Sequence, residues 1–494
     1  MAGFESGETV RRGTLFSLLA EAVRVVAAAA LTLVLVRVLA PHEFGILALA
    51  SGIGIVVGVL SDFGTSASAS RFVAERRSDP AAVAAVVRDA LRIKLLISGV
   101  VALALFALAG PVADAYGEPD LVWPLRAVAA VTLTQSVFTL FASVGIGLAR
   151  NALQARMYSV QSITETLSAI TIVALGGGAT GALLGRTAGY VLAAAVGGFV
   201  IARLVGRRIA PGRRDQGYGR RIATYAGALL VINAAWVVFD QIDVLLIGAY
   251  LGSASAGLFQ APLRVALLAT IAGQAISNAV APRVARHQED ATSIPTLLLA
   301  LRLLVLLGMA ITVVLMVWSR PLVDLLLGED YRESAEVLLA VGPFIFFGFV
   351  APLITVSANY LGHARRRMPI AVGTLALQIV LDVILIPRWG IVGPAIATSV
   401  SFGIYTILHL RLLVDVLDLD VRPLALTFGR ALVAGGAFAG VLALAGTGTD
   451  LGLTSWILGL AGGLAAYAGV LLALGELRGG ELRGLQAMAR RRGA

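Results

Sequence analysis

Long apolar blocks separated by short polar connections follow one another along almost the whole chain. A helix that crosses the hydrocarbon core of a bilayer needs about 20 mainly apolar residues, whereas barrel strands would be about ten residues long and alternating. Backbone groups in lipid must be satisfied within the segment, which also favours helices. We therefore predict an all-α polytopic membrane protein with fourteen transmembrane helices. The expected spans are residues 13–40, 43–70, 88–113, 121–149, 155–175, 179–205, 220–249, 254–283, 293–318, 332–361, 367–386, 391–413, 424–445 and 451–475.

Composition supports this interpretation and removes several kinds of chemistry. Of the 494 residues, 58% are hydrophobic and 14% are charged, against about 45–50% and 25% in soluble proteins. The chain has no cysteine, which excludes disulfides, thiolate metal sites and cysteine nucleophiles. Its four histidines are far apart and never at i, i+4, so no zinc motif is present. We expect no cofactor and no metal.

The net charge of +10 reflects membrane topology before it suggests nucleic acid. Most of the 39 Lys and Arg residues fall in one set of alternate connections and at both termini, while the opposite connections are acidic. Such a bias places both termini in the cytoplasm. The composition is rich in Ala, Gly and Arg and typical of a high-GC prokaryote. We therefore expect a multi-pass protein of the plasma (inner) membrane with no nucleic-acid partner.

An internal repeat with an offset of about 210 residues divides the chain. Leu39–Gly45 falls on Leu251–Gly257, and Pro111–Asp114 falls on Pro321–Asp324. Each half then holds six spans, so the two lobes share one orientation and are related by a pseudo-two-fold axis along the membrane normal. Two C-terminal helices lie outside the repeat. The expected parts are an N-terminal six-helix lobe (1–212), a C-terminal six-helix lobe (213–418), helices 13 and 14 (419–477) and a basic cytoplasmic tail (478–494).

Three motifs in these halves carry a resemblance to a known family. They are Arg37-x-Leu-x-Pro-x-Glu-Phe-Gly45, Asp243-Val-Leu-Leu-Ile-Gly-Ala-Tyr-Leu-Gly252, and Asn359-Tyr-Leu-Gly362 followed by Ile386-Pro-Arg-Trp-Gly-Ile-Val-Gly393. The chain resembles the polysaccharide-transporter (Wzx-type) oligosaccharide flippases of the multidrug/oligosaccharidyl-lipid/polysaccharide exporter superfamily. The resemblance implies two lobes around a central cavity and alternating access. It also implies that a polyprenyl-diphosphate-linked glycan is moved to the outer leaflet of the bilayer for cell-surface polysaccharide biosynthesis. A polymerase or glycosyltransferases of the same pathway are the implied protein partners.

Polar stripes on three expected spans predict the substrate cavity. Charges inside a span cost about 2.5–3.5 kcal/mol on insertion scales, so each is a functional candidate. Arg24 and Arg264 are expected to bind the diphosphate, because a guanidinium stays charged and offers forked donors. Arg24 has a second interpretation, a structural pair with Glu21 at i, i+3. The other expected substrate-binding residues lie on the same faces: Asn233, Trp236, Gln274 and Asn278. Trp236 also fits a simple packing role.

Four carboxylates within expected spans are candidates for binding a coupling cation or proton: Glu165, Asp240, Asp243 and Asp382. A carboxylate in a low-dielectric site has a raised pKa and exchanges a proton nearer neutral pH. The alternative for each is a helix–helix hydrogen bond or a charge in a cavity wall.

Sharper catalytic motifs are missing. The sole lysine, Lys94, follows Ile93, so the chain has no phosphate-binding Gly-Lys-Ser/Thr loop. Gly176-x-Gly-x-x-Gly181 lies in a turn between two spans, without the preceding strand that a dinucleotide site needs. We therefore predict a transporter with no catalytic residues. The alternatives are a cation-coupled multidrug exporter of the same superfamily and, in a different class, a membrane glycosyltransferase or polymerase. A lipid II flippase remains within the first class.

Overall fold

The computed structural model describes residues 10–62, 64–205, 218–284 and 292–476. Side chains of residues 10–22, 218–233, 235 and 364 are outside the described part. The expected lobe boundary at 212/213 and the expected tail 478–494 therefore lie outside the described residues, as do the side chains of Glu21 and Asn233. Every regular element in the described ranges is helical, as the apolar blocks predict.

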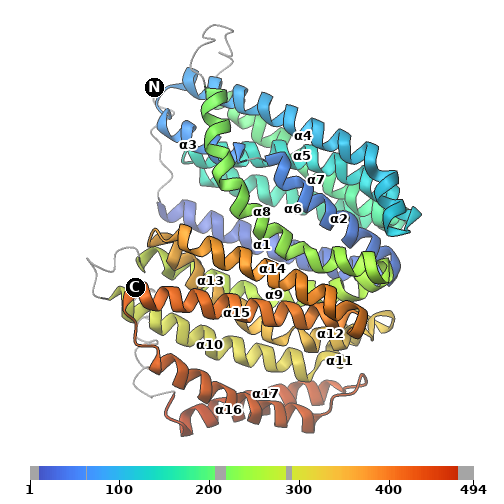
Figure 1. Ribbon diagram of the computed structural model, residues 1–494, viewed down its shortest axis with the longest axis vertical. Helices are drawn as coiled ribbons and strands as arrows, with labels where there is room; N and C mark the ends of the chain where they lie inside the picture. Colours follow the sequence, from blue (N-terminus) through green and yellow to red (C-terminus); the bar gives the residue numbers. More distant parts are fainter. Residues whose placement is uncertain (1–9, 63, 206–217, 285–291, 477–494) are drawn as a thin grey trace. The chain divides into compact units, whose positions relative to one another are not determined.

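The chain forms two compact units, residues 1–261 and residues 262–494 (Figure 1). Unit 1 holds α1 (Val10–Val38), α2 (Pro41–Asp62), α3 (Thr65–Glu75), α4 (Pro80–Tyr116), η1 (Pro119–Leu121), α5 (Val122–Gly147), α6 (Asn151–Ile172), η2 (Val173–Gly177), α7 (Gly178–Val205), α8 (Tyr218–Leu251) and the start of α9 (Ser253–Val284). Unit 2 holds the rest of α9, α10 (Ser293–Val317), α11 (Ser319–Leu326), η3 (Glu329–Tyr331), α12 (Ser334–Ala340), α13 (Gly342–Tyr360), α14 (Ala364–Trp389), α15 (Val392–Leu417), α16 (Arg422–Ala445) and α17 (Leu453–Ala473).

Within the described ranges, eleven candidate spans are long and apolar enough to cross a membrane. They expose many large apolar side chains, among them Leu96, Val100 and Leu103 on α4. Such surfaces are tolerated where the solvent is lipid. The chain is therefore a multi-pass helical membrane protein.

Two expected spans are interrupted. The expected span 43–70 ends as α2 at Asp62, and α3 begins after Gly64, whose φ of 68° lies in the left-handed region that glycine adopts without strain. The expected span 332–361 is divided at Val341 into α12 and α13. Pro343 follows at the start of α13, where its missing N–H costs no helical hydrogen bond. A hydropathy window does not detect either break, because the flanking residues stay apolar.

Helix α4 shows how local sequence sets the ends of a long element. Asp79 caps its N-terminus by accepting hydrogen bonds from the N–H groups of Ala81 and Ala82, and Pro80 occupies the first helical position. Gly117 ends the helix with a φ of 66°. The helix therefore begins eight residues before the expected span 88–113.

Small residues bring α6 and α7 together in unit 1. Gly181, Gly185 and Gly189 recur every fourth position along α7 and form one stripe. A Cβ at Gly185 would overlap the backbone of Ala169, and one at Gly189 would lie 2.8 Å from the carbonyl oxygen of Gln161. The backbones of the two helices can therefore come into direct contact. In Figure 1, α4, α5 and α7 lie side by side in the same unit.

In unit 2, α16 and α17 lie side by side and α16 packs on α10 (Figure 1). Trp318, which is 1% exposed, follows α10 and donates its indole N–H to the carbonyl oxygen of Gly446 at 3.0 Å. Its ring meets Trp456 of α17 edge-on, with ring centroids 4.7 Å apart. The two C-terminal helices are thus attached to α10 by a buried aromatic anchor at this end.

The repeated glycine turns meet inside unit 1, where α2 and α9 begin. A Cβ at Gly45 would overlap the carbonyl oxygen of Ser253, and a Cβ at Gly257 would overlap that of Pro41. Gly45 and Gly257 are the equivalent residues of the two repeats. Each therefore makes room for the other repeat's first helical turn, which explains why the motif contains glycine there.

Candidate functional site

Arg24 lies exposed on α1, and Arg264 lies half-buried on α9. Arg24 belongs to unit 1 and Arg264 to unit 2. The expected pairing of Arg24 with Glu21 lies outside the described side chains. Each arginine is thus part of a helix long enough to span the membrane, which is the setting in which a charge is a functional candidate.

The expected polar face of α8 divides into exposed and buried positions. Trp236 is 45% exposed and stacks on Phe239, with ring centroids 5.6 Å apart. Asp240 is exposed and accepts a hydrogen bond from the Gln241 amide at 2.6 Å. Asp243, one turn further along, is buried. The side chain of Asn233 is not among those described. Two of the predicted residues on this face are therefore accessible from outside the unit, and one is not.

Gln274 and Asn278 on α9 are both exposed and bonded to each other, with 3.3 Å between Gln274 Nε2 and Asn278 Oδ1. Their repeat mates Asp62 and Ser66 make the same i, i+4 contact in unit 1, where the Ser66 hydroxyl donates to Asp62 at 2.6 Å. The sequence repeat is thus accompanied by a repeated side-chain contact.

Lys94 adds a cation to the Asp62–Ser66 contact that the sequence did not predict. Its ammonium is fully buried and donates to Asp62 and, at 2.8 Å, to Ser66. From the sequence, this lysine was considered as part of a phosphate-binding loop, which it does not form. The structure instead uses it to join α2, α3 and α4. A buried charge is stable only when it is paired in this way.

Glu165 of α6 forms an ion pair with Arg186 of α7, with 2.8 Å between Arg186 Nε and Glu165 Oε1. The Gln161 amide donates to the other carboxylate oxygen. Arg186 lies inside the expected span 179–205 and inside α7, where the glycine stripe brings it to α6. The i, i+4 spacing of Gln161 and Glu165 predicts the contact between those two residues, but it does not indicate a partner on α7.

Asp382 of α14 is fully buried in unit 2 beside two neutral polar side chains. The Gln378 amide nitrogen lies 3.3 Å from Asp382 Oδ2 and 3.0 Å from the Thr398 hydroxyl oxygen on α15. Three buried oxygen-bearing side chains from two helices thus lie together. Carboxylate, amide and hydroxyl oxygens are the ligands that hard cations prefer.

A second polar cluster attaches the C-terminal helices to α10. Glu476, which is 2% exposed, accepts hydrogen bonds from Arg302 of α10 at 2.6 Å, from Thr427 of α16 at 2.6 Å and from Arg430 of α16 at 2.7 Å. Burial alone would raise the pKa of Glu476. The hydrogen-bond donors together lower that pKa by more than burial raises it, so the pKa of this carboxyl lies below its ordinary value. Arg430, which sequence analysis did not assign to any site, is thus part of a structural cluster.

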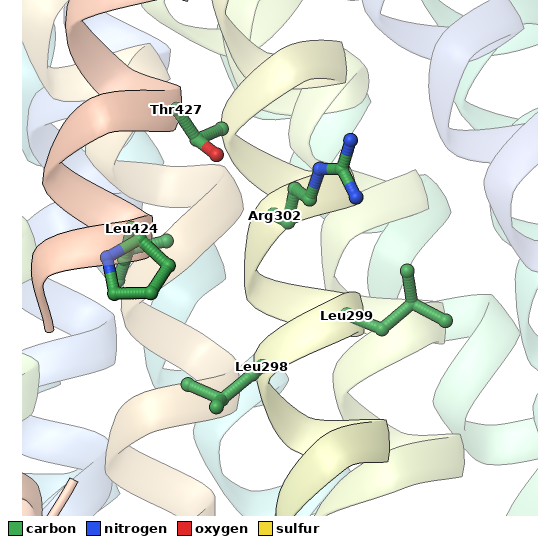
Figure 2. Close-up of a pocket in the computed structure, with 6 residues that line it drawn as sticks. Leu298, Leu299, Arg302, Leu424 and Thr427 are labelled. Carbon is green, nitrogen blue, oxygen red and sulfur yellow. The ribbon is translucent and has the colours of Figure 1, made fainter. Parts of the chain in front are cut away.

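Beside this cluster, α10 and α16 enclose a pocket of about 260 Å³. Figure 2 shows Leu298, Leu299 and Arg302 reaching into it from α10, with Leu424 and Thr427 opposite them on α16. Its lining is mainly apolar. Arg302 is committed to Glu476, so we assign this pocket no role in substrate binding.

The side chains described above are arginines, a lysine, carboxylates and neutral polar groups, which can bind charged or polar ligands. Over the residues that the structure describes, no three His, Cys, Asp or Glu side chains gather as a metal cluster. The exposed groups are suited to bind an anion and polar groups, and the buried Asp382 cluster is suited to bind a small cation.

Comparison with known families gives a match over most of the chain. A model of the family described as "Polysaccharide biosynthesis protein" matches residues 34–336. Two relatives come from Haloferax volcanii. The probable low-salt glycan biosynthesis flippase Agl15 is 24% identical over 267 residues, which cover 52% of this chain and 55% of the relative. The probable flippase AglR is 25% identical over 221 residues, covering 42% and 45%. The chain thus spans about half the length of the curated relatives it matches.

Solved structures share the fold at low sequence identity. The lipid II flippase MurJ in an inward closed conformation superposes with a TM-score of 0.75 at 14% identity, over 92% of this chain and 98% of that chain. An inward-facing multidrug resistance MATE family transporter of the MOP superfamily gives a TM-score of 0.62 at 13% identity, over 82% and 99%. At these identities the likeness shows that the fold is MurJ- and MATE-like.

Proposed function

Because the chain belongs to the polysaccharide biosynthesis protein family, we propose that it is a flippase, a transporter rather than an enzyme. Its substrate is a polyprenyl-diphosphate-linked oligosaccharide, which it moves from the cytoplasmic to the outer leaflet by alternating access for cell-surface polysaccharide biosynthesis. The observation that carries the proposal is the agreement of three facts: the family match, two relatives named as flippases, and a fold shared with a lipid II flippase.

The architecture proposed for this function has fourteen spans. Two six-helix lobes, residues 1–212 and 213–418, are related by a pseudo-two-fold axis along the membrane normal. Residues 419–477 add two helices, residues 478–494 form a basic tail, and both termini are cytoplasmic. The contact between the repeated turns at Gly45 and Gly257 supports the lobe symmetry, and the Lys/Arg bias supports the orientation.

In this proposal the diphosphate is bound by Arg24 and Arg264. Each offers a forked, permanently charged donor. Asn233, Trp236, Gln274 and Asn278 contact the remaining polar groups of the substrate. The exposure of Trp236, Gln274 and Asn278 supports this assignment, because a substrate-binding side chain must be accessible.

Coupling to a cation is proposed at Asp382. Of the four candidate carboxylates, Asp382 is fully buried and lies beside the amide of Gln378 and the hydroxyl of Thr398, whose oxygens are of the kind that binds hard cations. Asp240 and Asp243 are proposed as secondary carriers on α8. Glu165 is the least favoured, because its carboxylate is already neutralised by Arg186.

A flipping assay in proteoliposomes tests the function. The probe is a polyprenyl diphosphate bearing one fluorescent N-acetylhexosamine, and a membrane-impermeant quencher reports the outer leaflet. We expect Arg24→Lys and Arg264→Ala to weaken substrate affinity ten- to a hundredfold, which corresponds to about 1.5–3 kcal/mol for one lost charge-assisted contact. The matched control is Arg411→Lys, an exposed arginine on α15 outside the proposed site, which should transport at the wild-type rate.

The same assay separates the proposal from its alternative. The MATE-like fold also suits a cation-coupled exporter of organic cations. If the wild type moves a fluorescent organic cation and leaves the lipid-linked probe in place, the flippase proposal is wrong. If Arg264→Ala is stable and flips the probe at full rate, Arg264 does not bind the diphosphate.

A further inference from the structure

Two polar side chains of unit 1, Glu118 and His42, hold the first turn of α9. The Glu118 carboxylate, in the connection after α4, accepts a hydrogen bond from the backbone N–H of Ser253 at 2.8 Å. His42 Nδ1, in the first turn of α2, lies 2.7 Å from the hydroxyl oxygen of the same serine. A carboxylate at the N-terminus of a helix also interacts favourably with the helix dipole. Ser253 is therefore bound through its backbone and through its side chain.

These contacts lie at one end of a close-packed seam between α2 and the helices α8 and α9. Beyond the close approach of Gly45 to α9, a Cβ at Gly248 of α8 would overlap the side chain of Leu49, and a Cβ at Gly52 would lie 3.2 Å from Val244. Positions 45, 49 and 52 share one face of α2. This face therefore contacts α8 and α9 over about two helical turns.

The seam joins the two lobes of the proposed architecture. The helix α2 and the connection that carries Glu118 fall in residues 1–212, whereas α8 and α9 fall in residues 213–418. Alternating access requires the lobes to rock apart at one end while the other end stays closed. Ser253 is 1% exposed, and Ala48, on the seam face of α2, is 5% exposed. The seam is therefore closed in this structure.

The polar contacts are the directional part of the seam. Helices in a membrane gain little from apolar association, so packing and hydrogen bonds hold them together. A hydrogen bond to a charged group contributes more than one between neutral groups, which makes the contact of Glu118 with Ser253 the stronger of the two. Asp120, whose Oδ2 lies 3.5 Å from His42 Nε2, is on the other side of the imidazole ring.

We propose that Glu118 and His42 form a latch for this end of the seam, which releases Ser253 whenever the two lobes separate there. The strength of the latch sets how often the seam opens while the rest of the chain stays folded. Selective opening distinguishes a latch from contacts that only stabilise the fold. This inference rests on the lobes and the alternating access of the proposed function.

Thiol labelling of the purified full-length chain in detergent tests the inference. A water-soluble thiol reagent reaches both ends of the protein there, so membrane orientation does not enter, and the native chain has no cysteine. Ala48→Cys reports opening of the seam. Ser136→Cys, at a position of α5 that is 3% exposed, reports general unfolding, and Ser78→Cys, at an exposed position, gives the unhindered rate. We expect position 48 to react more slowly than position 78 and faster than position 136.

Removing a latch residue should open the seam selectively. Glu118→Ala should raise the labelling rate at position 48 about ten- to a hundredfold, the factor that one charge-assisted hydrogen bond corresponds to, and leave the rate at position 136 unchanged. His42→Ala should raise the rate at position 48 about two- to tenfold. The matched control is Asp114→Ala, an exposed acid near the end of α4, which should change neither rate. Equal increases at positions 48 and 136, or no increase in a folded Glu118→Ala protein, overturn the inference.

A conservative variant keeps the test decisive if Glu118→Ala does not fold. Glu118→Gln retains an acceptor oxygen without the charge, so the rate at position 48 should rise by less than in a full loss of the contact. Unchanged labelling in both Glu118→Gln and His42→Ala overturns the latch. The labelling rates are independent of the flipping assay. A chain that opens selectively at position 48 but leaves the lipid-linked probe in place supports the latch and contradicts the proposed substrate.

Discussion

Replacing Glu476 with alanine removes the acceptor that joins α10 to the last two helices. The carboxylate is 2% exposed and accepts hydrogen bonds from Arg302, Thr427 and Arg430. The substitution removes the carboxylate that both arginines contact. Because Glu476 follows α17 directly, the packing of α17 on α16 should weaken together with the contact to α10.

The size of the effect follows from the exposure of the partners. Losing one partner of a buried ion pair costs about 3–5 kcal/mol, and each hydrogen bond to a charged group contributes about 1.5–3 kcal/mol. Arg302 is 23% exposed and Arg430 is 36% exposed in their side chains, so water partly compensates for the lost anion. We therefore expect Glu476→Ala to lower the free energy of unfolding by about 2–4 kcal/mol.

The same cluster predicts a pH dependence with a definite sign. The pKa of Glu476 is lowered in the folded chain from its ordinary value of 4.5. A carboxyl whose folded pKa lies below its unfolded pKa stabilises the fold at higher pH, and that contribution is lost as the pH falls through the folded pKa. The stability difference between wild type and Glu476→Ala should thus be full at pH 7 and shrink as the pH falls below about 4.5.

The assay is thermal unfolding of the purified full-length chain in detergent, followed by intrinsic tryptophan fluorescence between pH 7 and pH 4. Glu333→Ala is the matched control, because Glu333 is an exposed acid outside the cluster. Equal melting temperatures for Glu476→Ala and Glu333→Ala at pH 7 would refute the structural role of the cluster. A difference from wild type that stays constant down to pH 4 would refute the pKa argument.

Three other outcomes are expected. Because the native chain has no cysteine, single cysteines at the exposed positions Thr447 and Ser78 test the topology. An impermeant thiol reagent applied outside should label the cysteine at position 447 and not the one at position 78, and the reverse pattern contradicts the orientation. Gly185→Ala should destabilise the chain by about 1–3 kcal/mol through overpacking of α6 against α7, whereas Gly436→Ala, which meets no atom within 4 Å, should leave the melting temperature unchanged or raised. Trp318→Phe should lose about 1 kcal/mol with the indole hydrogen bond, and an unchanged melting temperature would contradict that contact.

Sequence periodicity predicts which face of a helix is polar, but it does not predict the partner of a polar residue. Asp382 and Glu165 were both expected inside spans, and both are buried there. The pairing of Glu165 with Arg186 was not predicted, although both residues lie in expected spans. Likewise, no partner was predicted for Lys94 or for Glu476. A partner depends on how closely two helices approach, and that distance is set by glycines whose effect appears only after packing.

The apolar blocks predicted the helical architecture because the bilayer imposes one strong requirement on every spanning segment. Breaks within a block are set by single residues. Gly64 and Pro343 divide expected spans without lowering the local apolarity, so hydropathy alone does not detect them. The repeat offset proved more informative than any single motif, because it related the close approach at Gly45 and Gly257 and a polar side-chain contact in each unit.

Because Lys94 is buried, the chemical reactivity of its amine reports on local opening of the folded protein. Lys94 is the sole lysine of the sequence, and its ammonium is fully enclosed among α2, α3 and α4. An acylating reagent needs access to the amine nitrogen, which the enclosing side chains allow only when the junction of the three helices opens. Acylation of Lys94 therefore measures one local opening event at one known atom.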